Sequence, residues 1–109
     1  MSKKIHIAIS TDNLLESIKD YNKFLSALPI IVVDNQYALW ETETVNFSVR
    51  VDKNVPSGTL RHLGWQDSTA EKFTEETDVN GITWERFNRQ SQLDEIEILK
   101  STDNEGKNP

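Results

Sequence analysis

The start of the chain alternates strictly between bulky apolar side chains and polar or small ones. In KIHIAIS, three isoleucines are separated by His6, Ala8 and Ser10. A period of two places successive side chains on opposite faces of a strand. The pattern therefore predicts a half-buried strand with its isoleucines on one face and His6 on the other.

A helix is predicted next, in DNLLESIKDYNKFLSAL, because its apolar residues recur every three or four positions. Asp12 or Asn13 can cap it, with Asn13 and Glu16 at the spacing of a capping box, and Pro29 marks the end of the helix. Short apolar runs then predict three strands, at 30–34 (IIVVD), 37–41 (YALWE) and 44–51 (TVNFSVRV). The first half of the chain thus reads as β-α-β-β-β.

The pattern restarts after a polar linker at 52–58, which contains Pro and Gly. TLRHLGWQ (59–66) predicts a strand with His62 at its centre, as His6 is central to the first strand. DSTAEKFTEE (67–76) predicts a short acidic helix, and ITWERFN (82–88) predicts another strand. The second half is therefore interpreted as a shortened repeat of the first.

The end of the chain is less distinctive. QLDEIEILK (92–100) fits either a strand or a helix, and the polar tail STDNEGKNP is predicted to be disordered. We expect one α+β domain with a mixed, curved sheet and its helices on the convex face. Its predicted parts are a complete module at 1–51, the linker at 52–58, a shortened module at 59–89 and an extension at 90–109.

Composition narrows the possible functions. The chain has 109 residues, a formal charge of −6 and a pI near 4.8, which argue against a nucleic-acid surface. It has no cysteine, which excludes disulfides, thiolate metal sites and a cysteine nucleophile. No apolar run is long enough for a membrane span, and the N-terminus lacks the apolar core of a signal peptide. We expect a cytoplasmic protein that binds neither nucleic acid nor membrane.

Strand alternation singles out three polar side chains. If the helices cover the aliphatic faces, then His6, His62 and Glu85 all point to the opposite, concave side of the sheet. Two imidazoles and one carboxylate suit a divalent transition metal with positions left open, such as Fe(II), Mn, Ni, Co or Zn. The alternative is that the histidines are hydrogen-bonded structural residues and that Glu85 faces solvent; alternation does not decide between these readings.

Four segments resemble the vicinal oxygen chelate superfamily, which includes glyoxalase I, bleomycin and fosfomycin resistance proteins and extradiol dioxygenases. They are KIHIAISTDNLLESIKDYNKFL, YALWETETVNFSV, LRHLGWQDS and GITWERF, within residues 3 to 89. The YALW, VNFSV and HLGW pieces look most like the branch of cadmium- and arsenic-induced proteins, best known for carbon–arsenic bond cleavage. The resemblance implies paired βαβββ modules, with the second module shortened here.

The resemblance also implies a function. Its metal positions correspond to His6, His62 and Glu85, and Fe(II) is the favoured ion for a lyase or dioxygenase acting on a small oxygen-bearing ligand. No separate catalytic base is evident. The substrate-binding candidates form the surroundings of the metal: Tyr37 and Trp40 as pocket walls, Asn46 and Ser48 as hydrogen-bond donors, and Phe87 as an apolar floor.

Two departures from the relatives keep other functions open. The arsenic-lyase relatives use a cysteine pair, which this chain lacks, and its second module is too short for a complete substrate cup. The cup is expected to be open on that side unless the 92–100 segment or a partner subunit closes it. The alternatives are a non-catalytic small-molecule binding protein, like the bleomycin resistance proteins, and an inactive shortened relative. An exposed sheet edge favours a homodimer.

Overall fold

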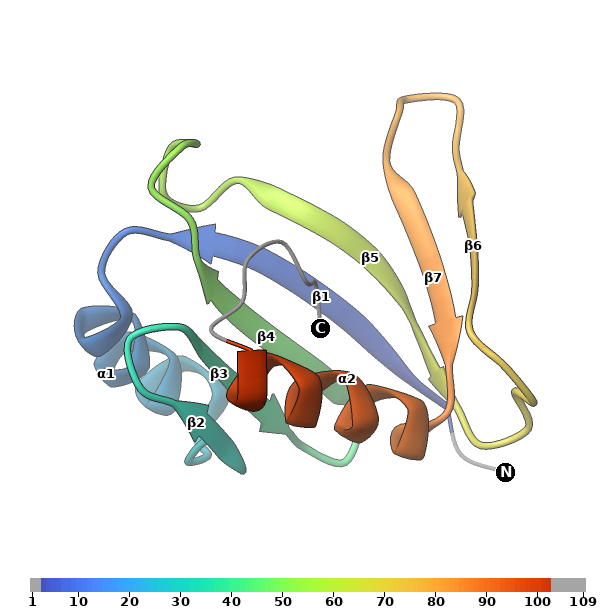
Figure 1. Cartoon of the computed structure of the whole chain (residues 1–109), viewed down its shortest axis with the longest axis horizontal. Coiled ribbons are helices and arrows are strands. Elements are labelled where there is room, and N and C mark those ends of the chain that lie inside the picture. Colours follow the sequence, from blue (N-terminus) through green and yellow to red (C-terminus); the bar gives the residue numbers. More distant parts are fainter. Residues whose placement is uncertain (1–2, 103–109) are drawn as a thin grey trace.

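The structure is a computed structural model that describes residues 3–102. Seven strands form one mixed sheet in the order β2-β3-β4-β1-β5-β7-β6, accompanied by two helices in an α+β arrangement (Figure 1). In chain order the elements are β1 (Lys3–Thr11), α1 (Leu14–Leu25), β2 (Ile31–Val33), β3 (Tyr37–Glu41), β4 (Val45–Val51), β5 (Leu60–Asp67), β6 (Thr74–Thr77), β7 (Thr83–Phe87) and α2 (Arg89–Thr102). No described helix is long and apolar enough to cross a membrane.

The two halves of the sheet have related pairings. In the first half, β1 is parallel to β4, and β3 and β2 follow antiparallel. In the second half, β5 is parallel to β7, and β6 follows antiparallel. The halves meet where β1 and β5 pair antiparallel at the middle of the sheet (Figure 1). Each half therefore begins with a central strand that pairs in parallel with the last strand of the same half.

Helix α1 covers the isoleucine face of β1. Of the two predicted candidates for its N-cap, Asn13 is the cap, because its side chain accepts a hydrogen bond of 3.2 Å from the Glu16 backbone N–H. It ends at Leu25, four residues before Pro29, because Ser26 takes the left-handed conformation at φ 52°. The buried residues under it are Leu14, Ala38, Trp40, Phe47 and Val49.

Helix α2 lies on the opposite face, in front of β4 and β1 in Figure 1. Ile96 and Leu99 pack against Val33, Tyr37 and Leu39, whose side chains alternate with those under α1. The 92–100 segment, which the sequence left open, is therefore helical. The expectation that the helices lie only on the convex face is wrong, because α2 covers the face on which His6 lies.

The prediction of a helix at 67–76 is also wrong. Residues 74–77 instead form β6, paired antiparallel with β7. This stretch has no apolar stripe to bury, and of its residues after Asp67 only Ala70 is buried. Its backbone groups are satisfied by β7, a long-range pairing that local propensity does not reveal. Residues 52–59 carry no helix or strand, and the tail predicted to be disordered lies mostly outside the described residues.

Candidate metal centre

A row of polar side chains crosses the sheet under α2. Residues in register on neighbouring strands share a face, and the pairings align one residue from each of six strands. The row runs Glu41, Asn46, His6, Gly64, Glu85 and Glu75. His62 pairs with Ala8, one step further along the same face of β1. The row therefore brings polar groups from distant parts of the chain to one place.

Three of these side chains converge. His6 Nε2 lies 3.0 Å from His62 Nε2, which lies 3.2 Å from Glu85 Oε1. The ligand atoms of the three residues all lie within 4.8 Å of one another, and the side chains are buried. Within residues 3–102 they form the only group of three or more His, Asp or Glu side chains so arranged. The trio that alternation selected is thus one cluster.

The spacing of this cluster fits a transition-metal ion. Bonds of roughly 2.0–2.2 Å at tetrahedral or octahedral angles place neighbouring ligand atoms about 3.0–3.5 Å apart. The separations of His62 Nε2 from His6 Nε2 and from Glu85 Oε1, 3.0 and 3.2 Å, lie within that range, and the ligand atoms of all three residues lie within 4.8 Å of one another. Without a cation, one proton between the two ring nitrogens makes an ordinary hydrogen bond. The three ligand atoms can therefore stay close to one another both with a bound cation and without one.

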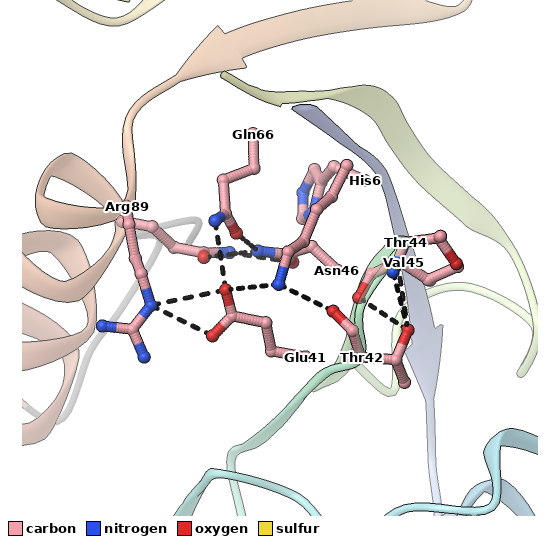
Figure 2. Close-up of polar contacts among 10 residues, drawn as sticks. His6, Glu41, Thr42, Thr44, Val45, Asn46, Gln66 and Arg89 are labelled. Carbon is pink, nitrogen blue, oxygen red and sulfur yellow. Dashed lines mark hydrogen bonds and ion pairs between the residues drawn. The ribbon is translucent and has the colours of Figure 1, made fainter. Parts of the chain in front are cut away.

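Hydrogen bonds fix the orientation of the first imidazole. Asn46 Nδ2 donates to Gln66 Oε1 at 2.7 Å (Figure 2). It also donates to Gln92 Oε1 at 2.7 Å. Asn46 Oδ1 therefore faces His6 Nδ1, 2.9 Å away, and accepts its proton. This tautomer leaves the Nε2 lone pair of His6 directed at the other two members of the cluster. A partner on the second ring nitrogen is the usual support of a metal-binding histidine.

Glu41 anchors the far end of this network. Gln66 Nε2 donates to Glu41 Oε2 at 3.1 Å, so a carboxylate, which only accepts, sets the orientation of the Gln66 amide. Arg89 Nε at 3.0 Å also binds this carboxylate (Figure 2), as does Lys4 Nζ at 3.1 Å. Burial would raise the pKa of Glu41, but the donors together lower it. The network thus ties β1, β3 and the first residue of α2 to the orientation of His6.

Both imidazoles are neutral at pH 7. Burial lowers the pKa of His6 to about 4, although hydrogen bonding to Asn46 opposes it. Burial, together with the neighbouring His6 and Arg61, lowers the pKa of His62 to about 3. A neutral imidazole has the free lone pair that a metal ion requires. Burial therefore keeps both imidazoles in the neutral form that can bind a cation.

Glu85 is shifted in the opposite direction. Burial, and then the carboxylates of Glu75 and Glu95, raise its pKa to about 7, while the positive charge of Arg61 opposes the shift. Arg61 was not predicted to act on Glu85, because simple alternation along β5 places Arg61 on the face opposite to that of His62. The register between β1 and β5 shifts at this point, from Ala8↔His62 to Ile9↔Leu60. Arg61 is the extra residue of this bulge.

Gly64 allows β5 and β7 to approach closely beside the cluster. A Cβ built on Gly64 would lie 2.3 Å from the Glu85 carbonyl oxygen. Any larger residue would push the β7 backbone away from β5. The absence of a side chain therefore determines where Glu85 stands relative to the histidines.

The other predicted site residues divide into three groups. Asn46 is part of the hydrogen-bond network, and the Phe87 ring packs edge-on against one imidazole, with centroids 5.0 Å apart. Tyr37 and Ser48 lie on the same face but are buried. Trp40 is not a pocket wall: it packs under α1 on the opposite face and donates to the Asn22 side chain. Gln66 and Gln92 were missed, because a lone glutamine carries no motif.

A pocket of about 350 Å³ adjoins the cluster. It lies between the second half of the sheet and the N-terminal part of α2. Its lining combines two members of the cluster with apolar, amide and acidic side chains: His6, Phe73, Glu75, Glu85, Phe87, Ser91, Gln92 and Glu95. The volume is at the lower end of the range for small-molecule sites. A small ligand in this pocket would contact both His6 and Glu85.

Comparisons with known proteins extend to the fold alone. No protein-family model and no curated protein matches the chain. The structure is similar to the crystal structure of an NAD-dependent benzaldehyde dehydrogenase from Legionella pneumophila, with a TM-score of 0.54 and 11% identity; the match covers 77% of this chain and 97% of that chain. It is also similar to a hypothetical protein from Staphylococcus aureus, with a TM-score of 0.58 and 10% identity, covering 79% of this chain and 33% of that one.

Proposed function

We propose that this protein binds a divalent transition-metal ion through His6, His62 and Glu85 and presents it to a small oxygen-bearing ligand. The observation that carries the proposal is the convergence of two neutral imidazoles and a carboxylate, with separations of 3.0 and 3.2 Å. A buried carboxylate and two buried imidazoles are costly to desolvate. A cation bound by all three would offset that cost.

The chain's own residues would prepare this site. Asn46 holds the ring of His6, Gln66 and, from α2, Gln92 bind Asn46, and Glu41 binds Gln66. A divalent ion held there would supply a Lewis acid for ligand oxygens, or an O2-binding centre if the ion is Fe(II). The pocket between β7 and α2 would position the ligand.

We further propose that the chain is a shortened member of the vicinal oxygen chelate superfamily. The support is the element order β1-α1-β2-β3-β4 in the first half and the parallel pairing of first and last strands in both halves. The second half has β6 between β5 and β7 but no helix. A lyase or dioxygenase reaction is proposed by analogy with that superfamily, with Fe(II) as the favoured ion.

Non-catalytic binding of a small molecule is the second candidate. It is favoured by the side chains beside His6, which are amides: Asn46 is hydrogen-bonded to both Gln66 and Gln92. An amide is too weak a base to move a proton in a reaction. The two candidates share one site and differ in whether the bound ligand is recovered unchanged.

Metal titration tests the proposal. Anaerobic calorimetric titration of the metal-free chain with Fe(II), Mn, Co, Ni and Zn should give one ion per chain for at least one metal. Glu85→Gln should weaken binding at least ten-fold, because it removes one of three ligands. Glu76→Gln is the matched control, since Glu76 is exposed and pairs with Trp84 on the other face of the same hairpin. Equal affinities for the two variants would contradict the proposed site.

A further inference from the structure

We infer that the pocket beside the metal centre selects ligands that carry a positive charge on an apolar body. The inference rests on the proposed metal site, because it concerns which ligand that site would accept. It is carried by the charges of the pocket lining, by an unfavourable pairing within the sheet and by two phenylalanine rings.

The charged side chains of the pocket are nearly all acidic. Glu75 on β6 and Glu95 on α2 line it from two sides, next to Glu85. The lining includes no lysine or arginine. A ligand in the pocket therefore experiences a negative potential from at least two directions.

Glu75 and Glu85 lie directly opposite each other on antiparallel strands. Like charges in this position destabilise a sheet. The positive charge of Arg61 acts on Glu85 from outside the pocket lining. A metal ion at the cluster would balance Glu85, and Glu75 and Glu95 would then remain as uncompensated charges facing the cavity. A cationic group on the ligand would balance the charges of Glu75 and Glu95.

A second metal ion fits these carboxylates less well. The only described His, Asp and Glu side chains whose ligand atoms converge on one point are His6, His62 and Glu85. Glu75 and Glu95 stand apart from that point and surround the cavity. A separated pair of carboxylates suits the diffuse charge of an organic ammonium group better than a small ion that needs close ligands.

The apolar part of the ligand would contact phenylalanine rings. Phe87 is buried beside His6, and Phe73 lines the outer part of the pocket with 49% of its surface exposed. An exposed ring next to carboxylates can gain both apolar burial and cation–π contact when an aromatic amine binds. The pocket volume of about 350 Å³ suits a single-ring ligand.

Three catechols that differ in the charge of the tail test the inference. Dopamine has a cationic tail, methylcatechol a neutral one and dihydroxyphenylacetate an anionic one, while all offer the same pair of adjacent oxygens. Each is titrated calorimetrically, without oxygen, into the zinc-loaded chain. Dopamine should bind on the order of ten-fold more tightly than methylcatechol, and dihydroxyphenylacetate more weakly by a similar factor. High salt should shrink both differences.

Variants assign the selectivity to residues. Glu75→Gln and Glu95→Gln, both at exposed positions, should each reduce the dopamine preference several-fold, whereas Glu76→Gln should leave it unchanged. Equal affinities for the three catechols, or a preference that survives the double Glu75→Gln, Glu95→Gln variant, would overturn the inference. Two zinc ions per chain, one of them lost in Glu75→Gln, would also overturn it.

The same series on the metal-free chain separates this inference from the proposed function. Absence of binding by all five metals would refute the metal site, and the order of the three catechols would still report on the pocket. In that case a preference for dopamine that depends on Glu75 supports charge selection. The lack of any such preference refutes charge selection as well.

Discussion

The two faces of the sheet are both covered by a helix, but they are built from different chemistry. Under α1 the buried side chains are apolar, as at Ala38, Trp40, Phe47 and Val49. Under α2 there is also an apolar cluster, of Val33, Tyr37, Leu39, Ile96 and Leu99, but beside it the sheet buries imidazoles, amides and a carboxylate. Apolar burial stabilises a fold, whereas polar burial is costly unless every group finds a partner. Both faces therefore contribute apolar burial to stability, and the α2 face in addition keeps polar groups that stability alone does not require.

The largest expected effect comes from converting the polar face to an apolar one. His62→Leu removes one imidazole and should lower metal affinity by about a thousand-fold or more, because two ligands hold a transition metal poorly. The metal-free variant should also lose about 1–3 kcal/mol in free energy of unfolding, because His6 Nε2 is left buried without its hydrogen-bond partner. Metal titration and urea unfolding measure the two quantities. Unchanged metal affinity would remove His62 from the site.

Asn46→Ala should have a smaller effect through the same imidazole. It removes the acceptor for the Nδ1 proton of His6 and should lower metal affinity by about 10–100-fold, as loss of such supporting hydrogen bonds usually does. Asn46→Asp keeps an acceptor at this place and should retain more affinity than the alanine variant. Equal losses in both variants, measured by the same titration, would indicate that Asn46 acts only in packing.

Trp40→Phe probes the other face. It shortens a buried side chain and leaves the Asn22 side chain without its 3.0 Å partner. The free energy of unfolding should fall by about 2 kcal/mol, while metal affinity stays within two-fold of the unaltered chain. Urea unfolding and metal titration of one sample check both. A large loss of metal affinity would show that the two faces are coupled.

The smallest effect is a pH dependence confined to the polar face. The two imidazoles have pKa values lowered from 6.5 to about 4 and about 3, so their contribution to stability is present above pH 6.5 and is lost as the pH falls. Glu85 acts oppositely: its pKa is raised from 4.5 to about 7, so its contribution is present below pH 4.5 and is lost as the pH rises.

Between pH 6.5 and 4.5, acidification lowers the stabilising contribution of the two imidazoles and raises that of Glu85. The metal-free chain should lose stability on acidification with a slope of about 1.4 kcal/mol per pH unit. Glu85→Gln removes the opposing group and should make the slope about twice as steep. Urea unfolding at several pH values measures both slopes. A flat profile in the unaltered chain would mean that the imidazoles are not buried in the neutral state.

Much of the fold could be predicted from local patterns. Alternation placed His6 opposite the isoleucines, and the capping signal placed Asn13 at the start of α1. β6 could not be predicted, because its strand character comes from pairing with β7 rather than from its own residues. The side of the sheet that α2 covers is also a long-range property, set by the contacts of Ile96 and Leu99 with β2 and β3.

The candidate site was predictable only as far as alternation holds. His6, His62 and Glu85 follow the alternation of their strands and were found. Trp40 was misplaced, because both faces of β3 are buried and the sequence does not show which one faces the site. Arg61 was missed because of the bulge in β5, which no residue pattern marks.

The most direct test of the metal centre uses the fact that the chain has only two histidines. Long-range ¹⁵N–¹H NMR of the imidazoles, recorded before and after one equivalent of zinc, resolves all four ring nitrogens. The account predicts that Nε2 of both His6 and His62 shifts on zinc binding, while Nδ1 of His6 stays protonated and hydrogen-bonded to Asn46. Unchanged Nε2 signals at saturating zinc, or coordination through Nδ1 of His6, would contradict it.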